Sequence, residues 1–308
     1  MPEIPDLTVY LEHLDRRVRG ERIERVRIGN PFVLRTVDPP VSAVEGRTVT
    51  GFRRIGKRLV FVLDEGLFLV IHLMIAGRLQ WRASAAPLNR KLGLAALDFP
   101  SGTLVLTEAS QKKRASLHVI RGEASLAMVN PGGLEVLGSK RADFAAALTK
   151  ENHTLKRALT DPTLLAGIGN AYSDEILHRA RLSPLKLTAK LEPAEIGRLH
   201  AAVKDVLREW TDRLRAETGD AFPSKVTAFR DGMAVHGRFG QACPVCGSLV
   251  ERIAYAENEA NYCPQCQTGG KLLADRSLSR LLKEDWPKTV EEREEMMARN
   301  RGDRGGSA

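Results

Sequence analysis

Four cysteines constrain this 308-residue chain more than any other feature. They are the only cysteines of the sequence, and they form two C-x2-C pairs with 16 residues between them: Cys243, Cys246, Cys263 and Cys266. Two thiolates three positions apart can bind one metal ion from a tight turn, and two such turns complete a tetrahedral four-sulfur site. We predict one structural zinc ion per chain, because four sulfur ligands leave no coordination position open for catalysis. The alternative is a redox-active or disulfide-bonded set.

The segment between the two cysteine pairs predicts a β-hairpin. Residues 248–255 alternate between apolar and polar side chains, residues 257–260 have the composition of a turn, and residues 261–262 begin the return. Together with its cysteines, this hairpin predicts a small zinc finger over residues 233–268.

The charge of the chain favours an acidic partner. The formal net charge is +9 and the isoelectric point is about 9.6. A basic face is often merely solvated, but a basic protein with a zinc finger is typical of nucleic-acid binding. No apolar run approaches the roughly 20 residues that cross a bilayer, and the first residues lack the regions of a signal peptide. We expect a monomeric, cytoplasmic protein without membrane partners that associates with the nucleoid when it binds DNA.

Hydrophobic periodicity divides the chain into a β-rich part and a helical part. A helix over residues 5–18 leads, and the following strands predict a β-sandwich or barrel, at residues 47–54, 57–63, 67–72, 94–97, 103–107 and 116–120. Later helices are predicted at residues 143–149, 154–165, 171–180 and 193–214. The expected fold is α+β and multidomain, with domains over residues 1–130, 131–232, 233–268 and 269–308.

Two further segments draw attention by length or charge. Residues 217–232 form a predicted loop that is long enough to indicate a function. The last 40 residues form a charged extension with predicted helices at residues 277–283 and 289–299. We expect a solvated appendage there, and partner binding is the alternative.

The most informative helical segment is a turn between two predicted helices. Gly167 and Gly169 permit a tight double turn, and Asn170 is placed to cap the next helix. Such a turn directs backbone N–H groups and a helix N-terminus towards an anion, and phosphate is the natural candidate. Lys156 and Arg157 lie one helix away. A plain helical hairpin is the alternative reading of the same pattern.

The amino terminus is the third element. Pro2 is small enough for Met1 to be removed, which would leave a proline secondary amine as the mature terminus. An α-amino group titrates near ~8, against ~10.4 for lysine, so much of it is nucleophilic at neutral pH. Glu3, beside it, can act as an acid or a base. The same three residues also begin proteins in which they have no catalytic role.

Six motifs together resemble the formamidopyrimidine-DNA glycosylase/endonuclease VIII family. They follow the family's order, cover about residues 1–267, and lie at residues 1–6 (MPEIPD), 54–57 (RIGK), 72–77 (HLMIAG), 167–172 (GIGNAY), 236–247 and 262–267. Each is weak or moderate alone, and the set is highly specific. The resemblance implies an N-terminal β-sandwich with a leading helix, and a helix–two-turn–helix domain that carries the zinc finger. DNA would run between these domains.

The resemblance also implies a mechanism. The Pro2 nitrogen would attack the sugar C1′ of a damaged, flipped-out nucleotide, the base would leave, and elimination from the resulting Schiff base would cleave the strand. Flipping is required because C1′ is shielded inside the stacked duplex. Glu3 would assist proton transfers at the sugar, and Lys57 would be a third catalytic residue that contacts phosphate and helps the chemistry at the lesion. The Asn170 turn and Lys156 would hold the flanking phosphates.

The chain departs from the family at the residues that would fill the gap left by the flipped base. His72 begins this segment and belongs to the DNA-contacting set that the resemblance implies. The formamidopyrimidine branch has the motif His-Leu-Gly-Met, whose methionine fills this gap, whereas this chain has His72-Leu-Met74-Ile75. Ile75, or Met74 in a shifted register, would have to serve.

Two further departures concern charge and shape. The branch has an arginine and a phenylalanine that complete the wedge; here the cation persists at Lys113 or Arg114, but Ala115 stands where phenylalanine would. In the hairpin, the family's phosphate-binding arginine is replaced by Asn258, which has no charge and is flanked by two glutamates. This loss predicts weaker binding of DNA and weaker strand cleavage.

Three functions therefore remain open. The first is a DNA glycosylase with abasic-site lyase activity, acting on double-stranded DNA. The second is a non-catalytic protein that binds damaged DNA or junctions, motivated by Ala115 and Asn258. The third is a zinc protein of translation or RNA binding. Oxidised pyrimidines, abasic sites and bulky or crosslinked bases fit the first function as well as oxidised purines do.

Overall fold

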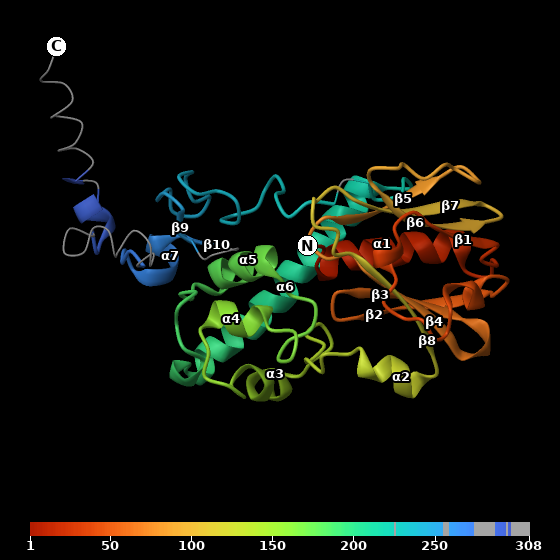
Figure 1. Cartoon of the computed structure of the whole chain (residues 1–308). Coiled ribbons are helices and arrows are strands. Elements are labelled where there is room, and N and C mark those ends of the chain that lie inside the picture. Colours follow the sequence, from red (N-terminus) through yellow and green to blue (C-terminus); the bar gives the residue numbers. More distant parts are fainter. Residues whose placement is uncertain (225, 255–258, 274–286, 294, 297–308) are drawn as a thin grey trace, which may run out of the picture. The chain divides into compact units, whose positions relative to one another are not determined.

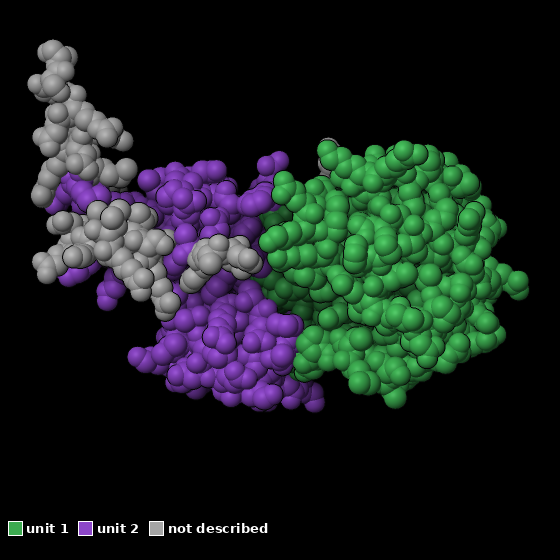
Figure 2. Space-filling model, viewed as in Figure 1, with its two compact units in different colours: residues 1–135, 165–169, 207–228 green, residues 136–164, 170–206, 229–308 purple. Residues whose placement is uncertain are grey.

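The computed structural model describes residues 1–224, 226–254, 259–273, 287–293 and 295–296 (Figure 1). Two compact units divide the chain, and neither is a single continuous segment (Figure 2). Unit 1 comprises residues 1–135, 165–169 and 207–228, and unit 2 comprises residues 136–164, 170–206 and 229–308. Among the described helices, none is both long and apolar enough to cross a bilayer.

Unit 1 begins with helix α1, Ile4–Val18, as the periodicity predicted. Pro5 lies in the first turn, where its missing N–H is not needed for a helical hydrogen bond. Leu7, Leu14 and Val18 follow at helical spacing, and all three are fully buried. The helix is therefore held by its apolar stripe, which packs into the core of the unit.

Two antiparallel sheets of four strands form the body of unit 1, in the orders β1-β6-β7-β5 and β2-β3-β4-β8. Their strands are β1 Arg25–Ile28, β2 Val49–Ile55, β3 Arg58–Leu63, β4 Leu67–His72, β5 Gly77–Arg82, β6 Gly93–Phe99, β7 Gly102–Glu108 and β8 Ser116–Arg121. One hydrophobic cluster joins Leu69 and Leu117 of one sheet to Leu97 and Leu104 of the other. The predicted β-sandwich with a leading helix is confirmed.

Short elements complete the unit, at η1 Pro31–Val33, η2 Val41–Val44, η3 Asp64–Gly66 and α2 Glu123–Met128. The sequence analysis did not predict strands β1 and β5 or helix α2. Strand β1 has only two apolar residues, and its pairing with β6 is supported by an ion pair of 2.7 Å between Arg27 Nε and Asp98 Oδ2. Strand β5 is likewise defined by its pairing with β7. The hydrophobic pattern of a segment does not show which distant strand pairs with it.

Unit 2 is mainly helical, with α3 Arg141–Leu148, α4 Leu155–Thr160, α5 Asn170–Ala180, η4 Thr188–Lys190 and most of α6 Pro193–Thr218. Residues 207–218 of α6 belong to unit 1. Strands β9 Glu251–Ala254 and β10 Glu259–Tyr262 form the expected antiparallel hairpin, and helix α7 Pro264–Thr268 follows it.

Several boundaries differ from the predictions. Helix α4 ends at Thr160 instead of residue 165, because Asp161 precedes Pro162 and adopts an extended backbone. Asn170, expected to be a cap, is the first helical residue of α5. The predicted helix at residues 277–283 lies outside the described residues. Of the one at residues 289–299, the described residues 290–293 and 295–296 are helical.

Candidate active site and zinc centre

The amino terminus is built into the body of unit 1. Pro2 is buried, and Glu3, which directly precedes helix α1, is 2% exposed. The backbone N–H of Glu3 donates to Asp6 Oδ2 at 3.0 Å. A carboxylate on the third helical residue therefore fixes the entry of the chain into α1. The first residues consequently have one defined conformation.

The two-glycine turn, far along the sequence, contacts this terminus directly. The N–H of Gly169 donates to the Glu3 carboxylate, and the N–H of Ile4 donates to the carbonyl of Gly167 at 3.2 Å. A Cβ atom at position 169 would lie 2.6 Å from Glu3 Cδ, and one at position 167 would lie 2.5 Å from Ile4 Cγ1. Both glycines are required because side chains there would occupy the space of the terminus.

This contact changes the interpretation of the turn. The sequence analysis directed its N–H groups at a DNA phosphate, whereas the N–H of Gly169 holds a carboxylate of the protein. Carboxylate and phosphate are both anions that backbone N–H groups bind. The N–H of Gly169 therefore binds the carboxylate of Glu3, and the phosphate contact expected of the turn stays a prediction.

Charged groups of both signs surround the terminal amine. Burial lowers the pKa of the amine of Met1; Glu3 and Asp6 oppose the shift, and Arg78 and Lys57 reinforce it. Lys57 lies in the tight turn between β2 and β3, whose other residue, Gly56, has a φ of 56°. A depressed pKa leaves more of an amine unprotonated at neutral pH, which is what a nucleophilic amine requires.

The residues expected to replace the flipped base lie in two separate loops of unit 1. Ile75 is 57% exposed in the turn after β4, and the preceding Met74 has a φ of 53°. His72 is the last residue of β4. Of the two candidates for a wedge, Ile75 is thus an exposed hydrophobic side chain at the tip of a turn.

The second loop, residues 109–115, is organised by Glu108. Its buried carboxylate accepts the backbone N–H groups of Arg114 at 2.8 Å and Ala115 at 2.9 Å. The ammonium of Lys113 donates to the Glu108 carbonyl. Arg114 is exposed, whereas Ala115 is 2% exposed. Of the two cations that were candidates for DNA contact, only Arg114 extends into solvent.

Lys156 has a different environment from the one expected. Its ammonium lies 2.5 Å from Asp174 Oδ1 and 2.7 Å from the Asn170 carbonyl, and the residue is 8% exposed. Asp174 also lies 2.8 Å from His236 Nδ1 through its other oxygen. In the next position, Glu175 accepts three backbone N–H groups, from residues 234, 235 and 236. Lys156 therefore belongs to a buried network that ties α5 to the segment leading into the hairpin.

The four cysteines lie together, as their spacing predicted. The sulfurs of Cys243 and Cys266 are 4.0 Å apart, and those of Cys246 and Cys263 are 3.3 Å apart. His178 of α5 adds a nitrogen, because its Nε2 lies 3.3 Å from the Cys243 sulfur. Possible ligand atoms of Cys243, Cys263, Cys266 and His178 all lie within 4.8 Å of one another. Thiolate and imidazole are the donors that zinc prefers, so the residues fit a zinc ion.

Comparisons with known proteins agree with this geometry. Residues 1–115 match the model of the formamidopyrimidine-DNA glycosylase N-terminal domain, residues 136–217 match its helix–two-turn–helix domain, and residues 240–269 match the zinc finger found in this glycosylase and an isoleucyl-tRNA synthetase. A formamidopyrimidine-DNA glycosylase of Symbiobacterium thermophilum is 33% identical over 286 residues, which covers 87% of this chain and 89% of the relative.

The chain belongs to the formamidopyrimidine-DNA glycosylase family. An uncharacterised glycosylase-like protein of Mycobacterium tuberculosis is 44% identical over 151 residues, or 49% of this chain and 94% of that protein. The Lactococcus lactis enzyme bound to DNA with an abasic site has a similar fold, with a TM-score of 0.77 and 26% identity over 86% of this chain and 99% of that one.

This family member carries a structural zinc ion in its zinc finger. The ion supplies a cross-link at a small buried cluster that, in the described part of the zinc finger, contains Val235, Val250, Cys243 and Cys263. Cys246 and His178 are the two groups that distinguish a four-cysteine site from one with a histidine. Of the cysteines, Cys246 is exposed.

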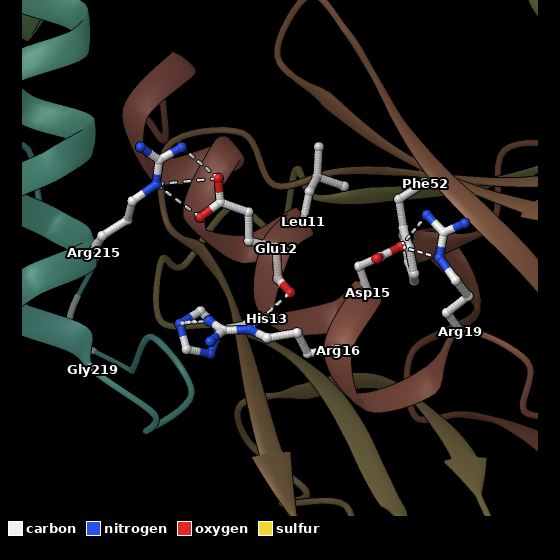
Figure 3. A pocket seen from close by; sticks show the side chains of 9 residues that line it. All are labelled: Leu11, Glu12, His13, Asp15, Arg16, Arg19, Phe52, Arg215 and Gly219. Atoms are coloured by element: carbon white, nitrogen blue, oxygen red, sulfur yellow. Dashed lines mark hydrogen bonds and ion pairs between the residues drawn. The ribbon is translucent and has the colours of Figure 1, made fainter.

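A pocket of about 590 Å³ on unit 1 of this glycosylase-family chain lies along α1 (Figure 3). Its charged groups are already paired: Arg215 forms hydrogen bonds with both oxygens of Glu12, and Arg19 Nη2 lies 2.6 Å from Asp15 Oδ1. Phe52 and Leu11 provide apolar walls. The pocket begins about two helical turns after Glu3, and its ion pairs join α1 to α6.

Sequence reasoning missed four groups that organise the site, namely Arg78, Glu108, Asp174 and His178. Arg78 donates from Nε to the carbonyl of Val226 at 2.6 Å, and so fixes the long loop that was predicted over residues 217–232. Of the four, only Glu108 had a signal in the sequence, as an acid between two predicted β segments. Asn258, the final DNA-contact prediction, lies outside the described residues.

Proposed function

We propose that this chain is a DNA glycosylase with abasic-site lyase activity that uses the Pro2 nitrogen as its nucleophile. The observation that carries the proposal is the buried amino terminus, where the N–H of Gly169 holds the Glu3 carboxylate directly after the buried Pro2. A restrained carboxylate next to a nucleophilic amine is the pair that glycosidic bond cleavage through a Schiff base needs.

The chemistry begins after removal of Met1. The lone pair of the Pro2 nitrogen forms a bond to C1′, and the bond from C1′ to the base breaks with its electron pair on the base, which takes up a proton from water. The Glu3 carboxylate accepts the proton that the Pro2 nitrogen then loses. Glu3 donates this proton to the sugar ring oxygen as the bond from C1′ to that oxygen opens, and the nitrogen lone pair forms the iminium ion. Loss of a proton from C2′ expels the 3′ phosphate and cleaves the strand. Hydrolysis of the iminium returns the amine.

The proposed substrate is double-stranded DNA with a damaged base or an abasic site, and the nucleotide must leave the helix for C1′ to be reached. Relatives bound to such DNA support this class of substrate. The exposed Ile75 would fill the gap in the stack. Contacts with the DNA backbone are proposed for Lys57, His72, Lys113, Arg114, Asn170 and Asn258. Lys156 would support them indirectly, by positioning Asn170 through its carbonyl.

We further propose that the protein acts as a monomer, that it is cytoplasmic and associates with the nucleoid on DNA, and that its domains cover residues 1–130, 131–232, 233–268 and 269–308. The four cysteines are the proposed zinc ligands: Cys243, Cys246, Cys263 and Cys266.

The test is borohydride trapping on a duplex that contains an abasic site, followed by mass mapping of the linked peptide. Borohydride reduces an iminium to a stable amine, so an adduct on Pro2 is expected, and Pro2→Gly should lose it while keeping DNA affinity nearly intact. An adduct on a lysine would retain the lyase but move the nucleophile. Binding without any adduct would overturn the proposal in favour of a non-catalytic damage reader. Intact-mass analysis of the protein used should show removal of Met1.

A further inference from the structure

On one sheet face of unit 1 and directly beside it, the basic side chains of Arg58, His118 and Arg35 have no carboxylate partner among the residues that the structure describes. We infer that Arg58, His118 and Arg35 form a phosphate-binding surface that extends from His72 across the β2-β3-β4-β8 sheet and binds a phosphate of the DNA backbone. The inference rests on the proposed function, and it deepens it by assigning further DNA contacts on the sandwich itself.

The strand register places these side chains in one group. Arg58 of β3 is paired with His72 of β4, and His72 is paired with Ser116 of β8. His118 lies two residues after Ser116 on the same face of β8, and its Nε2 is 3.3 Å from Ser116 Oγ. Paired residues have Cβ atoms about 5 Å apart, and diagonal neighbours about 7 Å. The side chains of Arg58, His72 and His118 can therefore reach one phosphate.

The rest of this sheet face is covered. Val60, Val70 and Ile120 lie on the same face as Arg58 and His118, and they form a buried cluster with Leu126 of α2. Arg58, His72 and His118 are only half-buried, because this helix covers the apolar end of the face. The uncovered end of the face is therefore the one that bears Arg58, His72 and His118.

The electrostatics of the group are one-sided. The pKa of His72 is lowered to about 4 by burial, by Arg58 and Lys57, and by His118. The pKa of His118 is lowered by burial, then by Arg58 and Arg35, and burial alone lowers the pKa of Arg58. No carboxylate contributes to any of the three shifts. These surroundings disfavour protonation of the two histidines, and an anion would stabilise the positive charges of Arg58 and Arg35.

Other arginines of unit 1 show how unusual this is. Carboxylates pair with Arg19, Arg27, Arg47, Arg53 and Arg54. Within the described part of the chain, the guanidinium groups of Arg58 and Arg35 form no ion pair or side-chain hydrogen bond. The half-buried guanidinium of Arg58 has lost part of its hydration without an acceptor, and a phosphate supplies that acceptor with two suitable oxygens. Arg35 is exposed, and its backbone N–H donates to the carbonyl of Leu117, the residue before His118, at 2.9 Å.

The test compares Arg58→Gln with Arg53→Gln. Arg53 lies on the neighbouring strand β2 and is paired with Glu123, so it is a matched control for a loss of positive charge on this sheet. Binding to a duplex with a reduced abasic site is measured by fluorescence anisotropy at several salt concentrations. Arg58→Gln should weaken binding about tenfold and reduce the slope of log K against log salt by about 0.9, whereas Arg53→Gln should leave both nearly unchanged.

His118→Gln is a second variant that keeps the test decisive if Arg58→Gln is poorly folded; about threefold weaker binding is expected from the loss of one hydrogen bond. Equal affinities and slopes for the wild type and for Arg58→Gln and His118→Gln would overturn the inference. A second result would also overturn it: Arg58→Gln lowers the rise in melting temperature that inorganic phosphate causes at constant ionic strength, but leaves DNA binding unchanged. The surface would then bind a small anion and not DNA.

Trapping separates this inference from the proposed function. A wild-type protein that shows the Arg58-dependent binding without any adduct would refute the lyase and retain the phosphate surface. If the wild type forms the adduct but binds DNA no more tightly than Arg58→Gln does, the lyase is retained and the phosphate surface is refuted.

Discussion

Replacement of Gly169 by alanine tests the link between the two-glycine turn and the amino terminus. The added Cβ would lie 2.6 Å from both Cδ and Oε1 of Glu3, whereas ordinary contacts begin at 3.4 Å, so a displacement of about 0.8 Å is needed. The group that must move is the carboxylate that the N–H of Gly169 itself holds. The substitution therefore acts on the proposed acid directly.

The magnitude follows from this displacement. A misplacement of about 1 Å in a catalytic group can cost roughly 100-fold in rate, which corresponds to about 2.7 kcal/mol at about 1.36 kcal/mol per factor of ten. Overpacking a buried site destabilises a protein by about 1–3 kcal/mol. We expect Gly169→Ala to cleave abasic-site DNA about 100-fold more slowly in single-turnover reactions, and to melt at a lower temperature than the wild type.

Gly138→Ala is the matched control. No heavy atom lies within 4 Å of a Cβ at position 138, and its φ is not positive, so its rate and melting temperature should both match the wild type. The reasoning would be refuted if Gly169→Ala cleaved at a rate within threefold of the wild type. It would also fail if the variant lost stability but kept its rate after correction for the folded fraction.

Three further predictions concern other parts of the molecule. Cys263→Ser should release the zinc ion and unfold the hairpin, as measured by metal content and circular dichroism. His178→Phe should keep one zinc ion per chain if the four cysteines bind it, and loss of zinc from this variant would make His178 a ligand. Lys156→Met should destabilise the protein by about 3–5 kcal/mol, because Asp174 would remain buried without its cation; a smaller loss in chemical denaturation would contradict the network. The pKa of His13 is lowered to about 4 by burial, then by Arg16 and Arg17. The unfolded state therefore binds the extra proton between about pH 6.5 and 4, and stability is lost as the pH falls through this window. His13→Gln should flatten the pH dependence of the melting temperature there, and an unchanged profile would contradict the assignment.

The parts of the fold that sequence patterns predicted are those with long or regular periodicity. Helix α1, the strands β3 and β4, and helix α6 each repeat apolar residues at the spacing of their element, and each lies within a few residues of its predicted position. Strand β1 and the early end of α4 were not predicted. The first depends on a partner about 70 residues away, and the second on the conformation that Pro162 imposes on Asp161.

The site shows the same division. The cysteine spacing and the two glycines carried real chemical information, because metal binding and close backbone approach demand particular residue types. The anion at the turn was assigned to DNA because the sequence does not show that Glu3 lies beside Gly169. The phosphate contact of Lys156 was expected from the family resemblance, and its pairing with Asp174, 18 positions later and across a turn, is a tertiary feature that the sequence does not show. Local patterns indicate which groups can bind an anion but not which anion they contact.

The discontinuity of unit 1 has a consequence for the order in which the protein becomes competent during synthesis. The amine is made first, but the turn that restrains Glu3 is made 166 positions later, and residues 207–228 complete the unit later still. At about 5–20 residues per second, the ribosome needs roughly 10–35 s to reach Gly169. A nascent chain, or one cut before residue 165, therefore carries the reactive terminus without the geometry that would make it an enzyme.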